Sequence, residues 1–313
     1  MGSDIALTGK RIVVTGVTGQ IALPLAASLA QHNEVFGLAR FSDPEARARV
    51  EAVGVRPVIC DLATGNLAAT PDDIDYVLHL AVSQQPGHDY DEALRVNAEA
   101  TGLLLQRYRT AAAALVMSTH SVYQPHPDPL HVYAETDPIG DSQLPHSPTY
   151  GISKIGQEAV ARTCARMFDL PVVITRMNAA YGTNGNGGLL GIHLRSIAAG
   201  RPVTARWDPL VYQPMHQDDI NAQVAGLLAA ATTPATILNW AGDEAVTVQQ
   251  WSALMGELLG VPADVRVVEE PGTLRGSLAD VSRRTAAAGA CDVSWRNGVR
   301  QLVDHMRESS ASG

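Results

Sequence analysis

A glycine-rich turn follows an apolar, strand-like run in the segment RIVVTGVTGQIA, residues 11–22, and a helix-length segment begins near Pro24. Glycines let the chain turn tightly and let a phosphate approach the N-terminus of the next helix, whose free N–H groups and dipole favour negative charge. A Gly-x-x-Gly pair alone also occurs in ordinary turns, but its place after the first strand favours a dinucleotide. We therefore predict cofactor contacts from Gly16, Thr18, Gly19, Gln20 and Ile21.

Working outward from this turn, strand-like runs alternate with helix-length segments, which predicts βαβ units and a parallel sheet. We expect strands at Arg11–Thr15, Glu34–Ala39, Arg56–Ile59, Tyr76–Leu80, Ala114–Ser118 and Pro171–Thr175. Helices at Glu92–Thr110 and Tyr150–Phe168 carry apolar residues three or four apart and would cover the sheet. The predicted fold class is α/β, a doubly wound parallel sheet (Rossmann fold) with a smaller C-terminal substrate lobe.

Two stretches interrupt the alternation, and both follow the carboxyl ends of strands, where open α/β sheets bind ligands. Gln124–Pro148 holds six prolines, and five of the ten residues in Gly182–Gly191 are glycine, so we expect lids there. Helices are expected near Asp218–Ala231, Thr247–Leu259 and Val293–Met306. We predict a dinucleotide-binding domain of residues 1–178 plus about 216–242, and a substrate-binding lobe of residues 179–215 plus 243–313.

Composition limits the partners. The 313 residues include 23 basic and 32 acidic side chains, and a net charge of −9 disfavours nucleic acid and anionic membranes. Cys60, Cys164 and Cys291 have neither disulfide-framework nor metal-site spacing, so we predict no metal and a reducing cytoplasm. Residues 1–10 resemble no signal peptide, and no apolar run reaches the 18 residues of a spanning helix. We expect a soluble cytoplasmic homodimer that binds a small-molecule substrate.

The end of the second predicted strand bears on the choice of cofactor. An Asp or Glu there would bind the ribose 2′-OH of NAD, whereas this chain has Ala39 followed by Arg40. A guanidinium suits a 2′-phosphate, so we predict NADP, with NAD as the alternative if Arg40 is only a solvated surface residue. Asp61 and Leu62, after the third strand, are predicted to contact the adenine, although Asp61 also suits an ordinary turn.

Tyr150 and Lys154 lie four residues apart at a predicted helix start and therefore share one helical face. A phenol with a pKa of about 10 is a poor acid or base near neutrality until a fixed cation stabilises its phenolate. Lysine supplies a compact ammonium, and Lys10 and Lys154 are the only lysines in the chain. The pair therefore indicates proton transfer, with an exposed helical pair as the alternative.

Thr119 follows the fifth predicted strand in the segment MSTHSVY, residues 117–123. With the glycine turn and Tyr-x-x-x-Lys in this order, the chain resembles the extended short-chain dehydrogenase/reductases, which include the NAD-dependent epimerases and dehydratases. Further matching segments are LHLA at 78–81, Asn97, RMNAAYG at 176–182 and MHQDD at 215–219. The resemblance implies that Tyr150 is the acid/base, Lys154 its helper and Thr119 the ligand of the substrate oxygen. It also implies cofactor contacts from Leu80, Ala81, Val82, Asn97, Lys154 and Met177, and substrate contacts from Ser83, His120, Ser121 and Asn178.

The chain departs from the family pattern at several places. Ala22 replaces a common glycine, and His120 and Ser121 replace the Asp and Glu of sugar-nucleotide dehydratases, which makes dehydration by that mechanism unexpected. Tyr212 or Gln213 stands where epimerases carry a diphosphate-binding arginine. Glu269 and Glu270 stand at a second such place, and their charge disfavours a nucleotide sugar unless Arg206 or Arg275 substitutes.

The predicted function is an NADP-preferring oxidoreductase that moves hydride to or from a carbonyl or secondary alcohol of a small, non-nucleotide substrate. The alternative is a nucleotide-sugar C4 epimerase that uses the same three residues and keeps its cofactor bound. A non-enzymatic dinucleotide sensor is a third hypothesis, against which Thr119, Tyr150 and Lys154 argue, because a sensor needs no proton donor. Histidines are expected around the cleft at positions 120, 126, 131, 146, 193 and 216, and Trp207 and Tyr212 are candidates for an apolar wall.

Overall fold

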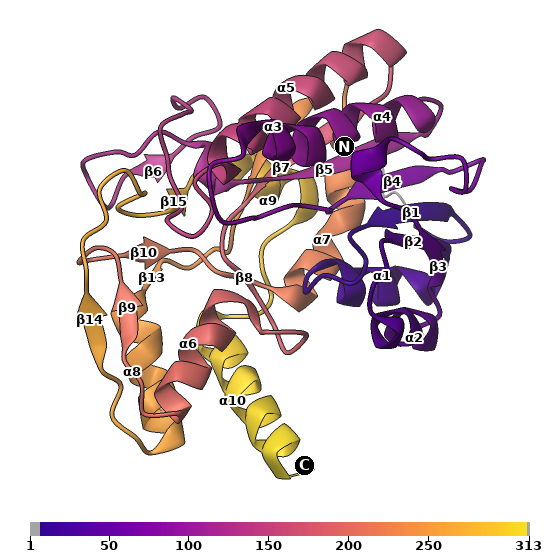
Figure 1. Ribbon diagram of the computed structural model, residues 1–313. Helices are drawn as coiled ribbons and strands as arrows, with labels where there is room; N and C mark the ends of the chain where they lie inside the picture. The colour runs from indigo at the N-terminus through magenta and orange to yellow at the C-terminus, as the bar shows by residue number, and fades with distance from the viewer. Residues whose placement is uncertain (1–6, 312–313) are drawn as a thin grey trace.

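Seven parallel strands form the central sheet in the order β12-β7-β5-β4-β1-β2-β3 (Figure 1). The computed structural model describes residues 7–311; residues 1–6 and 312–313, which belong to the predicted N-terminal segment and to the predicted domain ends, lie outside the described residues. The strands of this sheet are β1 (Arg11–Thr15), β2 (Glu34–Ala39), β3 (Arg56–Ile59), β4 (Tyr76–His79), β5 (Ala113–Thr119), β7 (Val172–Met177) and β12 (Thr236–Trp240).

The doubly wound α/β fold is confirmed, and all six predicted strands are present within two residues of their expected ends. The six strands predicted for the sheet do not include β12, because this segment contains the polar residues Thr236 and Asn239 and shows no continuous apolar run. It was also wrong to treat residues 182–191 as a loop throughout. Helix α6 (Gly188–Ala198) begins inside that stretch, since Gly187 and Gly188 have the left-handed φ of +67° that turns the chain into the helix.

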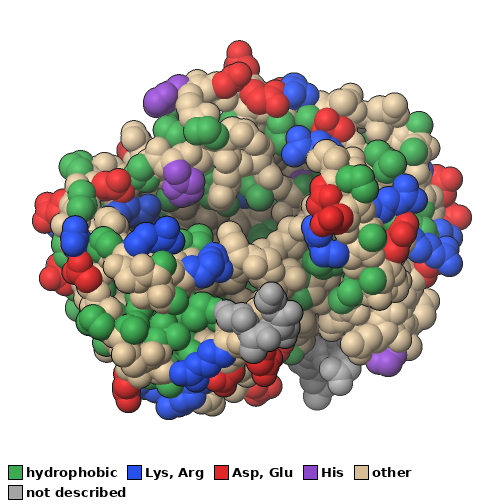
Figure 2. Space-filling model, turned by 60° about the horizontal axis from the view of Figure 1, so that its bottom comes forward, with side chains coloured by type: hydrophobic (Ala, Val, Ile, Leu, Met, Phe, Trp, Pro, Cys, Tyr) green, Lys and Arg blue, Asp and Glu red, His purple; other side chains and the backbone are tan. Residues whose placement is uncertain are grey.

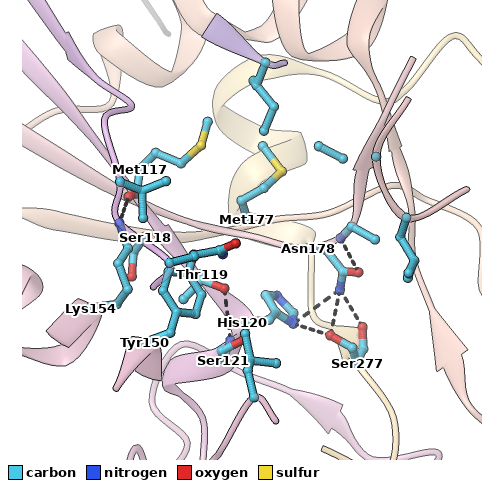
Figure 3. Close-up of a pocket in the computed structure, with 18 of the residues that line it drawn as sticks. Met117, Ser118, Thr119, His120, Ser121, Tyr150, Lys154, Met177, Asn178 and Ser277 are labelled. Carbon is cyan, nitrogen blue, oxygen red and sulfur yellow. Dashed lines mark hydrogen bonds between the residues drawn. The ribbon is translucent and has the colours of Figure 1, made fainter. Parts of the chain in front are cut away.

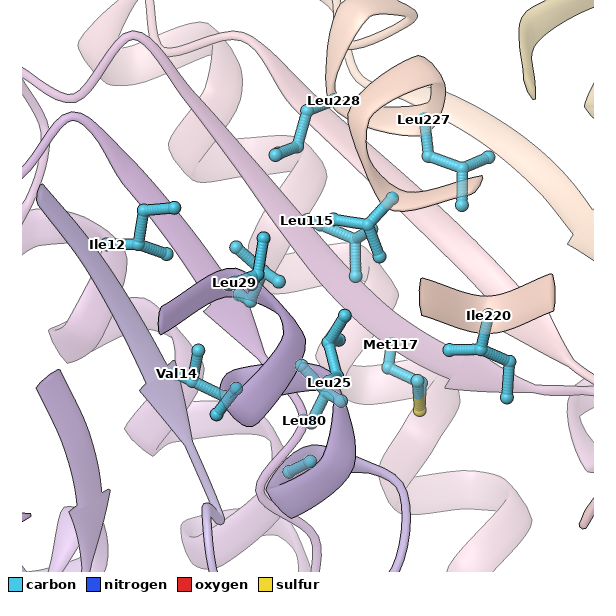
Figure 4. Close-up of a cluster of buried hydrophobic side chains, with 14 of the residues drawn as sticks. Ile12, Val14, Leu25, Leu29, Leu80, Leu115, Met117, Ile220, Leu227 and Leu228 are labelled. Atoms are coloured by element: carbon cyan, nitrogen blue, oxygen red, sulfur yellow. The ribbon is translucent and has the colours of Figure 1, made fainter. Parts of the chain in front are cut away.

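Helices cover both faces of the sheet. On one face α1 (Ala22–Ala30) and α7 (Gln217–Ala229) pack against alternate residues of β1 and β5, and Figure 4 shows Leu25, Leu115 and Ile220 in this cluster. On the other face lie α4 (Ala100–Arg107) and α5 (Tyr150–Phe168), against Ala114 and Val116 of β5. Successive strand residues thus face opposite layers, as a sheet buried on both sides requires.

The remaining elements near the sheet are short. The predicted helix at residues 92–110 is observed as α3 (Tyr90–Leu94), a π-helical turn η2 (Arg95–Glu99) and α4. The other elements of this part are α2 (Pro44–Ala52), the 3-10 turns η1 (Leu62–Thr64) and η3 (His120–Val122), β6 (Val132–Tyr133) and α9 (Ser282–Ala288). Strand β6 interrupts the proline-rich stretch, where it pairs with β15 (Leu278–Ala279).

A third hydrophobic cluster lies beside the sheet, at the lower left of Figure 1. It is built from α6, α8 (Val248–Leu259) and α10 (Trp295–Ala311), which pack on one another. Two-stranded sheets join this region, formed by β8 (Ala180–Tyr181) with β11 (Met215–His216), β9 (Val203–Ala205) with β14 (Val265–Val267), and β10 (Val211–Tyr212) with β13 (Val246–Thr247). The smaller C-terminal lobe is therefore present.

Candidate functional site

A cleft of about 500 Å³ lies where the carboxyl ends of β1, β4, β5 and β7 meet the smaller lobe. Figure 2 shows a hollow in this face of the molecule, with basic and histidine side chains near its rim. Its lining runs from the glycine turn to the lobe and comprises Gly16, Gly19, Gln20, Ile21, Ala22, Leu80, Val82, Gln84, Met117–Ser121, Ser142, Leu144, His146, Tyr150, Lys154, Met177–Ala180, Gly188, Leu189, Arg206, Leu210, Tyr212, Leu274, Gly276 and Ser277.

The glycine turn has the geometry that a dinucleotide needs. Gly16 has a φ of +67°, and a Cβ built on it would lie 2.8 Å from Ala81 Cα, so only glycine fits. Helix α1 then begins at Ala22, and its N-cap residue Ile21 provides no side-chain cap. Because uncapped first-turn N–H groups beside a cleft attract anions, the turn suits the diphosphate of a nicotinamide cofactor.

Three consecutive residues of β5 hold three residues of one face of α5. The Met117 carbonyl accepts a hydrogen bond from Lys154 Nζ at 2.6 Å, and the Ser118 hydroxyl donates to Glu158 Oε1 at 2.6 Å. The Thr119 side chain lies beside the Tyr150 phenol (Figure 3), and its interaction with the phenol lowers the Tyr150 pKa. Figure 3 shows Lys154 and Tyr150 beside Met117 and Thr119. The strand end thus fixes the two helix residues that the sequence singled out.

Burial sets the protonation of these groups. Burial raises the pKa of Tyr150, while hydrogen bonds from Thr119 and Gln84 lower it. Burial lowers the pKa of Lys154 to about 7, against the opposing charge of Glu158. Glu158 itself is paired with Arg176, whose Nε and Nη2 lie 2.9 and 2.8 Å from its two oxygens. This bidentate ion pair is buried, and the charge of Glu158 acts on Lys154.

His120, Asn178 and Ser277 form a second cluster on the opposite wall of the cleft (Figure 3). Asn178 Nδ2 donates to the Ser277 carbonyl at 2.6 Å and lies 3.3 Å from His120 Nδ1. Ser277 Oγ lies 3.1 Å from the same nitrogen. Burial, followed by the charge of Arg176, lowers the pKa of His120 to about 3. The cluster is therefore neutral.

The structure brings most of the predicted site residues together. All three candidate catalytic residues line the cleft, as do the predicted cofactor contacts Gly16, Gly19, Gln20, Ile21, Leu80, Val82, Lys154 and Met177 and the predicted substrate contacts His120, Ser121 and Asn178. Residues outside the lining are Thr18, Arg40, Asp61, Leu62, Ala81, Ser83 and Asn97.

Several of these outer residues have local structural partners. Asn97 is buried, where its side chain accepts from the Ser83 N–H at 2.8 Å and donates to the Ser83 carbonyl at 2.9 Å. Asp61 caps η1 by accepting from the Ala63 N–H. Arg40 is exposed just after β2.

The lining residues that were not predicted include Gln84, Ser142, Leu144, Leu189, Leu210, Leu274 and Ser277. Of the expected histidines, His120 and His146 line the cleft, whereas His126 stacks on His131 and His193 accepts a hydrogen bond from Trp251. Tyr212 lines the cleft and Trp207 does not.

No helix within the described residues is long and apolar enough to cross a membrane. The described side chains include no group of three or more His, Cys, Asp or Glu arranged for a metal ion.

The fold and the Thr-Tyr-Lys site define a class of nicotinamide-dependent enzymes built on the Rossmann sheet. The chain belongs to the NAD dependent epimerase/dehydratase family, whose sequence profile matches residues 12–212. No curated protein sequence matches it.

Solved structures share the fold along almost the whole chain. A UDP-glucuronic acid 4-epimerase from Bacillus cereus, in complex with UDP-glucuronic acid and NAD, has a TM-score of 0.81 and 21% identity over 96% of this chain and 99% of that chain. MoeE5, in complex with UDP-glucuronic acid and NAD, has a TM-score of 0.80 and 25% identity over 96% of this chain and 99% of that chain. The dTDP-glucose 4,6-dehydratase DesIV from Streptomyces venezuelae, with NAD bound, has a TM-score of 0.80 and 24% identity over 96% of this chain and 98% of that chain.

Proposed function

We propose that the chain is an NAD-dependent nucleotide-sugar epimerase, which inverts a C–OH carbon by oxidising it and then reducing it from the other side. This replaces the small-molecule oxidoreductase that the sequence favoured. The observation that carries the proposal is the course of the cleft, which runs past Thr119 and Tyr150 to Arg206. The solved neighbours with UDP-glucuronic acid and NAD support the same substrate class.

Arg206 removes the main argument against a nucleotide sugar. Its side chain is 23% exposed at the substrate end of the cleft, where Nη2 donates to the Tyr212 hydroxyl at 3.3 Å. Its contact with Glu270 is long, at 3.9 Å, which leaves guanidinium donors for a phosphate. Glu269 and Glu270 do not line the cleft. Arg275 is stacked on Trp207 at 4.2 Å, also outside the lining.

The side chains suggest the order of proton steps. Thr119 and Tyr150 would hold the reacting hydroxyl, and Tyr150 would accept its proton while the Lys154 ammonium stabilises the phenolate. NAD, held by the glycine turn and Lys154, would supply the hydride acceptor and donor. Tyr150 would return the proton when the carbonyl is reduced. His120 and Ser121 provide no carboxylate acid–base pair, so we propose epimerisation rather than dehydration.

Nucleoside diphosphates test the substrate class. UDP and dTDP at many times their Kd should raise the melting temperature of the NAD-loaded protein, because a ligand bound only by the folded state stabilises it. Arg206→Met should remove most of this shift, whereas Arg201→Met, an exposed arginine outside the cleft, should keep it. Stabilisation and turnover by small alcohols alone, without any diphosphate effect, would restore the oxidoreductase hypothesis.

The preference for NADP stays a prediction that rests on Arg40, and the solved neighbours carry NAD. If the 2′-phosphate contacts this exposed guanidinium, Arg40→Ala should weaken NADPH binding about tenfold and leave NADH binding unchanged in a titration. Equal effects on the two cofactors would exclude the contact.

The division into two lobes at residues 1–178 plus 216–242 and 179–215 plus 243–313 is likewise a proposal. The separate hydrophobic cluster of α6, α8 and α10 supports it. Helix α9, inside the second range, packs instead on α7 and β12. A homodimer and a cytoplasmic location stay predictions.

A further inference from the structure

A buried carboxylate, Glu158, lies one helical turn beyond Lys154 in α5. Residues four apart share one face of a helix, and the two side chains are 3% and 2% exposed. Glu158 does not belong to the lining of the cleft, so it is not a contact of substrate or cofactor. Burying a carboxylate is unfavourable unless donors and a nearby cation compensate for the lost water. The partners of Glu158 therefore show what it does.

Two strands of the sheet hold the Glu158 carboxylate in place. Oε1 accepts from the Ser118 hydroxyl at 2.6 Å and from Arg176 Nε at 2.9 Å, and Oε2 accepts from Arg176 Nη2 at 2.8 Å. Arg176 is anchored in turn, because its Nη1 donates to the Glu135 carbonyl at 3.1 Å and its guanidinium lies 4.8 Å from the centre of the Tyr123 ring. These donors favour the ionised form of Glu158 and fix both of its oxygens.

Lys154 has little else to keep it charged. Its Nζ donates to the Met117 carbonyl at 2.6 Å, the one hydrogen bond of this ammonium among the described residues, although an ammonium has three N–H donors. Burial lowers the pKa of Lys154 to about 7, and the charge of Glu158 opposes that change. Without the carboxylate, the neutral amine would dominate at neutral pH, and a neutral amine cannot stabilise a phenolate.

The other ionisable groups around Lys154 supply no negative charge. His79 on β4 is neutral, because burial and then the Lys154 charge lower its pKa to about 3. His120 in η3 is neutral for a similar reason, with the charge of Arg176 as the second cause. The Tyr150 phenol, whose pKa burial raises, is neutral before proton transfer. The charged side chains of α3, η2 and α4, which pack against α5, are exposed or half-buried: Asp91, Glu92, Arg95, Glu99 and Arg107.

We propose that Glu158 is a positioning residue, whose fixed carboxylate keeps the buried Lys154 side chain in its ammonium form while a proton moves at Tyr150. The inference rests on the proposed function for the proton step and adds to it a residue that lies outside the cleft. Glu158 acts through the ammonium and makes no contact with the reacting atoms. Ser118 and Arg176 serve the same step, because they hold the carboxylate ionised beside Lys154.

The charge of Lys154 can be measured directly, because Lys10 and Lys154 are the only lysines in the chain. Lysine labelled with ¹³C and ¹⁵N at the end of its side chain gives two NMR signals, which Lys10→Arg assigns. In the cofactor-free and the NAD-loaded protein, Glu158→Gln should lower the titration midpoint of Lys154 by about one pH unit or more, the effect of removing a nearby opposite charge. Glu99→Gln, the same change of charge at an exposed residue of η2, should leave the midpoint unchanged. An unchanged midpoint in Glu158→Gln would overturn the proposal and leave the proposed function standing.

A second variant decides the matter if Glu158→Gln fails to fold with Arg176 left unpaired. The double variant Glu158→Gln with Arg176→Met removes both charges of the buried pair, so no uncompensated guanidinium remains. The Lys154 midpoint should still fall, though by less than in the single variant, because a repelling cation has gone as well. A midpoint that stays or rises in the double variant would show that Arg176 cancels the charge of Glu158 at Lys154, and it would overturn the proposal.

The pH profile of turnover separates this role from a structural one. In Glu158→Gln, kcat should fall with rising pH at a lower pH than in the wild type, by the shift that NMR gives for the NAD-loaded protein, while KM for the nucleotide sugar stays the same. A uniform loss of kcat at every pH would mean that Glu158 only holds α5 against β5 and β7. Absence of any turnover of nucleotide sugars by the wild type would refute the proposed function, and the lysine titration would still decide the role of Glu158.

Discussion

Burial is the largest influence on the pKa values of both Tyr150 and Lys154. In the folded chain the ammonium donates to the Met117 carbonyl, and interactions with Thr119 and Gln84 oppose the rise that burial causes in the Tyr150 pKa. Burial raises the pKa of Tyr150 and lowers that of Lys154 to about 7. The two pKa values, which are close to each other in water, therefore move apart in the cofactor-free protein, because burial favours the uncharged form of each group.

Tyr150→Phe removes only the phenolic oxygen. We expect turnover to fall by about 10² to 10⁴, the usual contribution of a positioned acid–base group, while NAD affinity changes little. Steady-state rates and a cofactor titration measure the two effects. Tyr90→Phe, a change at an exposed tyrosine outside the cleft, should leave both unchanged. A Tyr150→Phe enzyme that keeps most of its rate would exclude Tyr150 as the proton carrier.

Lys154 gives the cofactor-free protein a definite pH dependence. Because burial lowers its pKa from 10.5 to about 7, the unfolded chain binds a proton between these values that the folded protein has released. Stability therefore rises with pH across this window, and the unfavourable burial of the ammonium is greatest below it. Lys154→Met should raise the free energy of unfolding at about pH 7, with a gain that shrinks toward about pH 10. Urea unfolding at both pH values measures this, and a pH-independent gain would contradict it.

At the level of elements, the turn between β1 and α1 decides whether a cofactor fits. Gly16 and Gly9 both have a φ of +67°, yet a Cβ on Gly16 would meet Ala81 Cα at 2.8 Å and one on Gly9 would meet nothing within 4 Å. Both alanine variants bear the left-handed strain of about 1–2 kcal/mol, and only Gly16→Ala adds a clash that moves the turn. We expect Gly16→Ala to abolish NAD binding by calorimetry and Gly9→Ala to preserve it. Equal NAD affinities of the two variants would show that the turn does not bind the cofactor.

Local spacing explains why this turn and the Tyr-x-x-x-Lys pair were readable from the sequence. A strand followed by Gly16 and Gly19, or Tyr150 four residues before Lys154, has its geometry fixed by short-range rules. By contrast, Ser277 reaches His120 across 157 residues of chain, and no local pattern marks it. Arg206 could be named as a candidate, but only the folded lobe places it on the cleft wall. Strand β12 was missed for the related reason that its pairing with β7, and not its own composition, makes it a strand.

For the whole molecule, one cleft joins the sheet and the smaller lobe. The glycine turn, the β5–α5 contacts and Arg206 occupy successive parts of its lining, an arrangement that suits the cofactor and the nucleotide sugar of the proposed function. Strands β9 and β10 flank Arg206; helix α6 packs on β9, and helix α8 packs on β13 and β14, which pair with β10 and β9. On the proposed function, the lobe would set the substrate class and the sheet would supply the chemistry.

The most direct measurement of the central claim follows a deuterium atom. UDP-glucose deuterated at C4 is incubated with the NAD-loaded protein, and UDP-sugars and cofactor are analysed by NMR and absorbance, with UDP-glucuronic acid labelled in the same way as a parallel substrate. We predict the C4 epimer with its deuterium retained, no accumulation of NADH, and no product from Tyr150→Phe. Deuterium transferred to released NADH, with an oxidised sugar and no epimer, would contradict the account.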